Sequence, residues 1–230
     1  MYVISISKLK SRRLDKIRWL YQQGIINESV WLAGGALRTL VDPKETIVDY
    51  DLFFKYDVRE HQSMDAFWHK HLTNVTETRE ALTKLGFKLT FECPEGKMYT
   101  YEKSICSVCG TVEIDAGYQH TLHIFCKQKV QLICEYFYSS PEELLATFDL
   151  TPTLFCTDGT RLWCYKSGVN AVKNKQCDLH KLIYPFSTFR RIMKYSNKGY
   201  NCQTAINKFI SNLIDRTSIL TEDEMRIYID

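Results

Sequence analysis

Two adjacent glycines, followed by two aspartates in alternate positions, constrain this chain more than any other feature. An apolar run at residues 30–32 leads into Gly34 and Gly35, and Asp49 and Asp51 come next with one tyrosine between them. A turn of small residues lets the backbone approach a phosphate closely. Carboxylates at positions i and i+2 of a strand point to the same face of a sheet. The pattern therefore predicts that the two aspartates hold Mg²⁺ against the phosphates of a nucleoside triphosphate.

The cost of burying charge supports this interpretation. Asp49 and Asp51 flank Tyr50 in an otherwise apolar segment, and two like charges buried close together are unfavourable without a cation between them. The alternative is a pair at the end of a strand that faces solvent, with Asp49 in a turn. The glycine pair upstream, at a distance that suits a strand–turn–helix–strand unit, favours the metal site.

Composition limits the class of protein. A hydrophobic content of 45% is enough for a substantial core, and the nine cysteines are an odd number scattered along the chain. This usage fits reduced intracellular thiols better than a disulfide framework. The sequence has no run of about 18 apolar residues, so it predicts no membrane span. Its first residues do not resemble a secretion signal. We expect a cytoplasmic protein, in the host cytoplasm if a phage encodes it.

The order of helix-like and strand-like segments predicts an α+β fold. We expect a mixed β-sheet flanked by helices over residues 1–165, and a small basic helical module over residues 166–230. The predicted strands are 30–32, 47–54, 87–91, 98–101, 121–126 and 129–134, with a hairpin over 150–165 that turns at Asp158-Gly159. The predicted helices are 14–23, 59–73, 77–85, 140–147, 170–183, 188–196 (capped by Ser187), 205–214 and 221–229.

Charge is unevenly distributed along the chain. Residues 21–160 carry twelve Lys and Arg against twenty acidic residues, whereas residues 161–216 carry eleven against two. The acidic part suits metal ions, and the basic part suits a polyanion such as RNA, DNA or a triphosphate. The alternative for any one basic residue is a solvated helix face.

Four basic residues are candidates for contact with the nucleotide. Arg38 lies one helical turn after the glycine pair, where it either reaches a phosphate or pairs with an acid. Arg190 and Lys194 share a helix face, with Arg191 beside them, and either bind phosphate or base or remain solvated. Two nearby tyrosines stack a base or, as we expect, pack in the core: Tyr195 and Tyr200.

The order of these motifs resembles the DNA polymerase beta-like nucleotidyltransferase superfamily. The local form at residues 32–38 and 49–52 is most similar to the head domain of tRNA CCA-adding enzymes and bacterial poly(A) polymerases. The overall layout also looks like nucleotidyltransferase-like proteins of phages and large viruses. Residues 148–151 loosely resemble that family's Arg-Arg-Asp-Phe-Thr motif, and residues 190–200 its neck helix. Two departures stand out, because Thr147 and Phe148 occupy the positions of the motif's two arginines.

The resemblance implies a Mg²⁺- or Mn²⁺-dependent nucleotidyltransferase. Such an enzyme moves a nucleoside monophosphate from a nucleoside triphosphate to a hydroxyl, here with an RNA (tRNA-like) 3′ end as the favoured acceptor. Gly34 and Gly35 then cradle the triphosphate, and Asp49 and Asp51 ligate metal. A protein or small-molecule hydroxyl is the alternative acceptor. A catalytically inactive module that binds nucleotide or inhibits a partner is the alternative outside the enzyme class.

A third carboxylate, which often activates the hydroxyl in this superfamily, is not obvious. Gln131 occupies the expected position on the neighbouring strand, and an amide cannot act as a base. Asp149 is the preferred substitute, either as a catalytic residue or in a structural turn. Glu135 and Asp115 are weaker candidates.

A separate pattern of cysteines and histidines suggests a structural zinc ion. Cys106 and Cys109 form a C-x₂-C pair, and His120 and His123 follow. Histidines at i and i+3 of a strand do not face the same side, so the absence of metal is the favoured interpretation. A second set of candidate ligands is Cys93 with Cys126.

Overall fold

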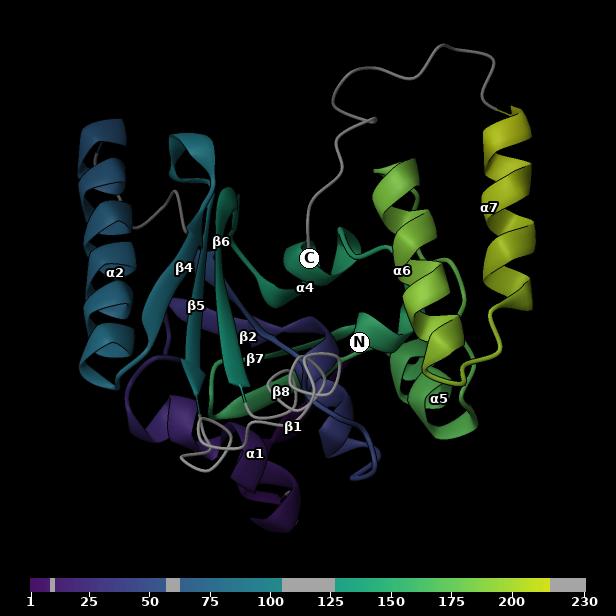
Figure 1. Cartoon of the computed structure of the whole chain (residues 1–230), viewed down its shortest axis with the longest axis horizontal. Helices are drawn as coiled ribbons and strands as arrows, with labels where there is room; N and C mark the ends of the chain where they lie inside the picture. Colours follow the sequence, from purple (N-terminus) through teal and green to yellow (C-terminus); the bar gives the residue numbers. More distant parts are fainter. Residues whose placement is uncertain (9–10, 57–62, 105–126, 216–230) are drawn as a thin grey trace, which may run out of the picture.

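A single mixed sheet organises the chain in the computed structural model, which describes residues 1–8, 11–56, 63–104 and 127–215 (Figure 1). The sheet has eight strands in the order β1-β8-β7-β2-β3-β6-β5-β4. Strands β3 and β6 are parallel, and every other neighbouring pair in this sheet is antiparallel. The predicted α+β class with a mixed sheet is therefore confirmed.

The strands are β1 (Tyr2–Ser5), β2 (Val30–Ala33), β3 (Tyr50–Lys55), β4 (Lys88–Glu92), β5 (Met98–Ser104), β6 (Lys127–Tyr138), β7 (Phe155–Thr157) and β8 (Arg161–Cys164). The α-helices are α1 (Ser11–Gln22), α2 (Met64–Lys84), α4 (Pro141–Ala146), α5 (Lys166–Asn174), α6 (Pro185–Asn197) and α7 (Gln203–Asp215). Short 3₁₀ helices are η1 (Ile6–Lys8), η2 (Gly34–Leu40), η4 (Pro94–Gly96) and η6 (Thr151–Thr153).

Alternation along the central strands gives the sheet two different faces. On β3, Tyr50, Leu52 and Phe54 enter the main core, together with apolar residues of α1 and α2. The intervening residues belong to the other face, where Phe53 joins a smaller cluster with Trp31 of β2 and part of α4. Asp51 lies on this second face because the side-chain period of a strand is two. The fold thus keeps the acidic residue away from the main core.

The C-terminal helices form a second core beside the sheet. Ile192 and Tyr195 of α6 pack with Ala205 and Phe209 of α7, and Leu150 joins them from the chain that leads into the last hairpin. Helix α5 packs differently, because its Val172 belongs to the main core. Figure 1 shows α5, α6 and α7 gathered on the side of the molecule opposite α2. The proposed division at residues 165 and 166 stays a prediction.

Two helices differ from their predicted extents. The predicted helices 59–73 and 77–85 correspond, in the described residues, to the single helix α2, because no glycine or proline interrupts it and Val75 at its middle is buried. The predicted helix 170–183 is instead α5, which ends before Lys175 in the left-handed conformation (φ 50°). The chain after Lys175 makes β-bridges with distant segments instead of helical hydrogen bonds.

Smaller differences occur at the ends of elements. Helix α6 begins at Pro185 with Tyr184 as its N-cap, so Ser187 is a buried helical residue and not the cap. Strand β1 was not predicted, because its four residues gain their role only by pairing with β8 at the edge of the sheet. The predicted strand 121–126 and helix 221–229 lie outside the described residues.

Burial at the centre of the sheet should control stability. Leu52 is 0% exposed, and we expect Leu52→Ala to lower the free energy of unfolding by about 3 kcal/mol, because the cavity is lined by a packed core. Leu72→Ala is the matched control, since Leu72 on α2 is 60% exposed, and its effect should stay within about 0.5 kcal/mol. Urea unfolding followed by circular dichroism measures both, and equal effects would contradict this assignment of the core.

Candidate functional site

The glycine turn and Asp51 adjoin each other at one end of β2 and β3. Ala33, the last residue of β2, pairs directly with Asp51 in the antiparallel ladder. Gly34 follows with φ +83°, a backbone conformation that residues with a Cβ rarely adopt. A Cβ on Gly34 would lie 3.5 Å from Asp51 Oδ2 and 3.7 Å from Phe148 Cε2. The turn therefore needs glycine for its conformation, and its bare backbone faces a carboxylate.

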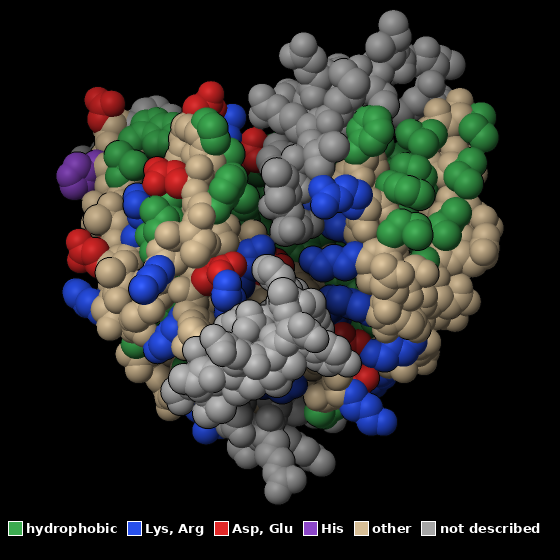
Figure 2. All heavy atoms as spheres, in the orientation of Figure 1, with side chains coloured by type: hydrophobic (Ala, Val, Ile, Leu, Met, Phe, Trp, Pro, Cys, Tyr) green, Lys and Arg blue, Asp and Glu red, His purple; other side chains and the backbone are tan. Residues whose placement is uncertain are grey.

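Asp49 lies where the start of β3 approaches helix α6. It is the residue directly before the strand, and its side chain is 15% exposed. Lys194 Nζ on α6 lies 4.0 Å from Asp49 Oδ2. The two predicted metal ligands thus lie at the start of β3, with Asp51 next to the glycine turn and Asp49 next to a lysine of α6. Figure 2 shows Lys and Arg side chains gathered along this boundary between the sheet and the C-terminal helices.

The register of the sheet places an amide next to Asp51. Asp51 pairs with Gln131 across β3 and β6, and Gln131 pairs with Thr100 of β5. Gln131 is 3% exposed, so its neutral side chain is buried beside the carboxylate. The predicted position of Gln131 is confirmed by this register. In the part of the chain that the structure describes, no three His, Cys, Asp or Glu side chains cluster closely enough to hold a metal ion.

Asp149 joins the sheet to helix α6. Its Oδ2 accepts hydrogen bonds from Arg191 Nη1 at 2.8 Å and from Thr188 Oγ1 at 3.0 Å. Its backbone carbonyl also accepts hydrogen bonds from the backbone N–H groups of His180 and Lys181. The structure therefore places Asp149 in contacts with the helical part, and does not bring it together with Asp49 and Asp51 as a third metal ligand.

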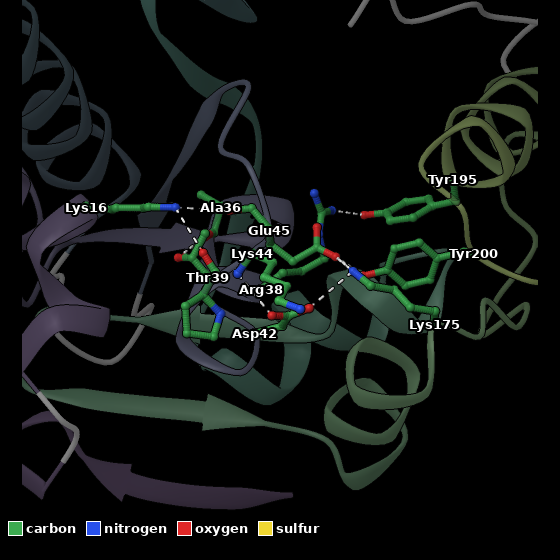
Figure 3. A network of polar contacts seen from close by, with 11 residues as sticks. Lys16, Ala36, Arg38, Thr39, Asp42, Lys44, Glu45, Lys175, Tyr195 and Tyr200 are labelled. Carbon is green, nitrogen blue, oxygen red and sulfur yellow. Dashed lines mark hydrogen bonds and ion pairs between the residues drawn. The ribbon is translucent and has the colours of Figure 1, made fainter.

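A buried polar network connects the segment after the glycine turn to the C-terminal helices (Figure 3). Arg38 is 3% exposed and donates from Nε to Glu45 Oε2 at 3.0 Å, and from Nη1 to the Tyr195 hydroxyl. Glu45 also accepts hydrogen bonds from Lys175 and from Tyr200, the latter at 2.8 Å. Arg38 therefore pairs with an acid and not with a phosphate. Tyr195 and Tyr200 are buried in the core, as the sequence analysis expected.

The same network explains Gly35 and holds the loop that leads to Asp49. A Cβ on Gly35 would lie 2.9 Å from Arg38 Nη1, so a larger residue would displace the guanidinium from its partners. From the other side, Lys16 Nζ of α1 donates to the Glu45 carbonyl at 3.1 Å. The loop between η2 and β3 is thus fixed at Glu45, four residues before Asp49.

Electrostatics within this network favour the charged forms. Burial alone would raise the pKa of Glu45, but hydrogen bonds from Lys175 and Tyr200 and the charge of Arg38 bring it below its ordinary value. Burial alone would lower the pKa of Arg38, but its partners Tyr195 and Glu45 raise it. The ion pair is therefore charged at neutral pH.

Lys198 is a functional candidate that the sequence motifs did not single out. Its pKa falls to about 8, because burial disfavours the charged form and because Arg38 and Lys194 add positive charge nearby. Asp49 acts in the opposite direction. A half-buried lysine near Asp49 suits binding of an anion, and perturbed groups of this kind gather at functional sites.

Glu45 and Lys175 were also missed, for a physical reason. They are 130 residues apart in the chain, and neither belongs to a local motif. Arg190, by contrast, is exposed on α6. The zinc candidates Cys106, Cys109, His120, His123 and Cys126, and the weak acid candidate Asp115, lie outside the described residues.

The residues present fit one magnesium ion bound together with phosphates. Mg²⁺ is usually held by one or two carboxylates plus oxygen atoms of the substrate's phosphates. Asp49 and Asp51 would supply the carboxylates, and the turn at Gly34, which has no side chain, leaves space beside Asp51 that a Cβ would fill. None of the described helices is long and apolar enough to cross a membrane.

Comparisons with known proteins agree with this geometry. The sequence matches the Gabija anti-defense 2 family, a family of phage proteins, over residues 7–175. A search of curated proteins finds no match. A CCA-adding enzyme in complex with ATP superposes with a TM-score of 0.55 at 14% identity, over 95% of this chain and 49% of the enzyme.

Two further solved structures give the same result. The Thermotoga maritima CCA-adding enzyme complexed with tRNA has a TM-score of 0.53 at 11% identity, over 94% of this chain and 46% of that one. A CCA-adding enzyme with CTP has a TM-score of 0.54 at 11% identity, over 94% and 47%. The chain thus has the nucleotidyltransferase fold and spans about half the length of these structures.

Loss of the Glu45 charge should destabilise the protein in a pH-dependent way. Glu45→Gln leaves Arg38 buried without its carboxylate, and we expect the free energy of unfolding at pH 7 to fall by about 3 kcal/mol. Because the folded-state pKa of Glu45 is lowered, its contribution is present above the ordinary value of 4.5 and is lost as pH falls through the folded-state value.

The measurement is urea unfolding of both proteins between pH 3 and pH 7. The gap between them should be widest at pH 7 and should shrink below about pH 4.5. Glu77→Gln, at an exposed position of α2, is the control and should track the unaltered protein. A gap that stays constant over the whole range would contradict a charged Glu45 in the folded state.

Proposed function

Since the chain belongs to the Gabija anti-defense 2 family, we propose that it acts against that defence system through a nucleotidyltransferase site. In the proposed reaction, an acceptor hydroxyl oxygen bonds to the α-phosphorus of a nucleoside triphosphate. The bond from that phosphorus to the α–β bridging oxygen breaks, pyrophosphate leaves, and the hydroxyl proton passes to solvent. The observation that carries the proposal is the Asp51 carboxylate beside the bare backbone of Gly34, with Asp49 next to Lys194.

We propose that one group of residues binds the nucleotide and its metal ion, and that a second group keeps the first in position. Asp49 and Asp51 are proposed to bind Mg²⁺, or Mn²⁺ in its place, which supplies neutralising charge to the triphosphate. The backbone at Gly34 and Gly35 and the ammonium group of Lys194 are proposed to contact the phosphates. These groups provide position and countercharge, which phosphoryl transfer needs more than covalent help.

Two other predicted residues are proposed to position the site without contacting the nucleotide. Arg38 is hydrogen-bonded to Glu45 and Tyr195. We therefore propose that it positions the loop that leads to Asp49 and does not itself bind a phosphate. Asp149 holds Arg191 and Thr188, and so orients α6. Arg190 is exposed on α6 and is proposed, with Arg191, to contact the nucleotide or the acceptor backbone.

RNA is the proposed acceptor, with a tRNA-like 3′ end favoured. The solved structures of similar fold include complexes with ATP, with CTP and with tRNA. The basic balance of residues 161–216, eleven Lys and Arg against two acids, also suits a polyanion. A protein or small-molecule hydroxyl remains the alternative acceptor.

One observation favours a second candidate function. Gln131 is buried at the position beside Asp51 where a third carboxylate would activate the hydroxyl. The second candidate is therefore a nucleotidyltransferase fold that binds nucleotide or inhibits a partner without turnover. The family's description, which names an effect against a defence system and no reaction, is consistent with either function.

Removal of both carboxylates should separate the two candidates. We expect the unaltered chain, given labelled nucleoside triphosphates, Mg²⁺ or Mn²⁺ and total tRNA, to incorporate label, and Asp49→Asn/Asp51→Asn to lose at least about 100-fold in rate. Glu77→Gln/Glu80→Gln removes two exposed carboxylates of α2 and is the control. Nucleotide binding without pyrophosphate release supports the non-catalytic module. Full activity of the double variant would contradict this site.

The lysines that face the site should govern affinity for the triphosphate. We expect Lys194→Ala and Lys198→Ala each to weaken binding of a nucleoside triphosphate about tenfold, equivalent to about 1.4 kcal/mol, because each removes a partly buried positive charge. Isothermal titration calorimetry with Mg²⁺ present measures this, and the loss should shrink at high salt. Lys84→Ala, a 79% exposed position on α2, is the control. Unchanged affinity in both site variants would contradict a triphosphate between β3 and α6.

A further inference from the structure

A partly buried aromatic side chain, Phe148, lies beside the candidate site. Its Cε2 atom is 3.7 Å from the position that a Cβ on Gly34 would take, and Asp51 Oδ2 is 3.5 Å from the same position. Among the described residues beyond the turn itself, only these two side chains come within 4 Å of that position. The ring of Phe148 and the carboxylate of Asp51 therefore border one small space in front of the glycine turn.

Elements from both parts of the chain fix the position of this ring. Its centroid lies 5.8 Å from that of the Phe53 ring on β3, in the apolar cluster of the sheet's second face. The Phe148 backbone N–H donates a hydrogen bond to the carbonyl of Leu145 in α4. The next residue, Asp149, is hydrogen-bonded to Arg191 of α6. These contacts hold the ring beside the glycine turn and leave part of it exposed.

The other groups of the candidate site are charged side chains and backbone. Asp49, Asp51 and Lys194 match the metal ion and the phosphates of the proposed nucleotide, and the bare backbone of Gly34 lies beside Asp51. The rest of a nucleoside triphosphate is a ribose and a flat base. An aromatic ring next to a phosphate site suits that part of the ligand, because every base has a π-face that can stack on the ring. Phe148 is in the position to provide this surface.

Two other roles for this ring fit less well. A residue that only completes the apolar cluster is expected to be buried, as Phe53 is with 9% exposure, but Phe148 keeps part of its surface exposed. Direct binding of phosphate needs positive charge or hydrogen-bond donors, and a phenyl ring has neither. Contact with the uncharged nucleoside agrees with both the exposure and the chemistry of the ring.

We propose that Phe148 forms the nucleoside-binding wall of this site, and that its ring packs against the base and ribose of the bound nucleoside triphosphate. This role rests on the proposed binding of a nucleoside triphosphate, and it explains how the chain holds the part of that ligand that carries no charge. A phenyl ring stacks on purines and pyrimidines alike and forms no hydrogen bonds with their edges. Phe148 therefore adds affinity for all four nucleotides and does not select among them.

The test compares ligands with and without a nucleoside. Isothermal titration calorimetry with Mg²⁺ measures binding of the full chain to each of the four ribonucleoside triphosphates and to inorganic tripolyphosphate, which consists of phosphates alone. Phe148→Ala should weaken binding of all four nucleotides about tenfold, because the stack on the ring is lost, and should leave binding of tripolyphosphate unchanged. Phe148→Tyr keeps the ring and should bind nucleotides like the unaltered chain. Phe91→Ala on β4, where Phe91 is 42% exposed, is the matched control and should change neither affinity.

Several results would overturn this role of Phe148. Normal nucleotide binding by Phe148→Ala would do so, and so would an equal loss of affinity for nucleotides and tripolyphosphate, or a loss confined to one base. These results leave the proposed function standing as long as the unaltered chain binds nucleoside triphosphates. If the unaltered chain binds neither ligand, the proposed function fails and the role of Phe148 fails with it. Phe148→Leu keeps an apolar side chain against Phe53 and replaces the alanine variant if circular dichroism shows that the latter is unfolded. It should lose at least about threefold in nucleotide affinity.

Discussion

The buried pair of Arg38 and Glu45 is the interaction on which the arrangement of this protein depends. The pair itself lies in the N-terminal part of the chain, and its partners Lys175, Tyr195 and Tyr200 come from the C-terminal part. Burying an ion pair is favourable only when further hydrogen bonds satisfy it, and here a lysine and two hydroxyls do so. Along the sequence the pair lies between the glycine turn and the two aspartates, so it fixes the segment that connects them.

Helix α6 is the element through which folding and the site are connected. One side of it builds the second core, and one side supplies Lys194 near Asp49. The Asp149–Arg191 pair sets its orientation against the sheet. Any change in the position of α6 would therefore alter the second core and the site together.

The sequence predicted the parts of the site that are local. The glycine turn and Asp51 lie close in the chain, and a short hairpin-like unit leaves few ways to arrange them; Gln131 followed from register along one neighbouring strand. Contacts between distant segments were out of reach, because no local pattern pairs Glu45 with Lys175 over 130 residues. The same limit explains α5, whose end is set by bridges made to other segments.

The most direct test of the central claim is a crystal structure of the chain with a non-hydrolysable nucleoside triphosphate analogue and Mg²⁺. Our account predicts that the phosphates lie between the Gly34 turn and Lys194, with the metal ion on Asp49 and Asp51. Phosphates bound at another surface of the chain, or density for the nucleotide with both aspartates turned away from it, would contradict the account.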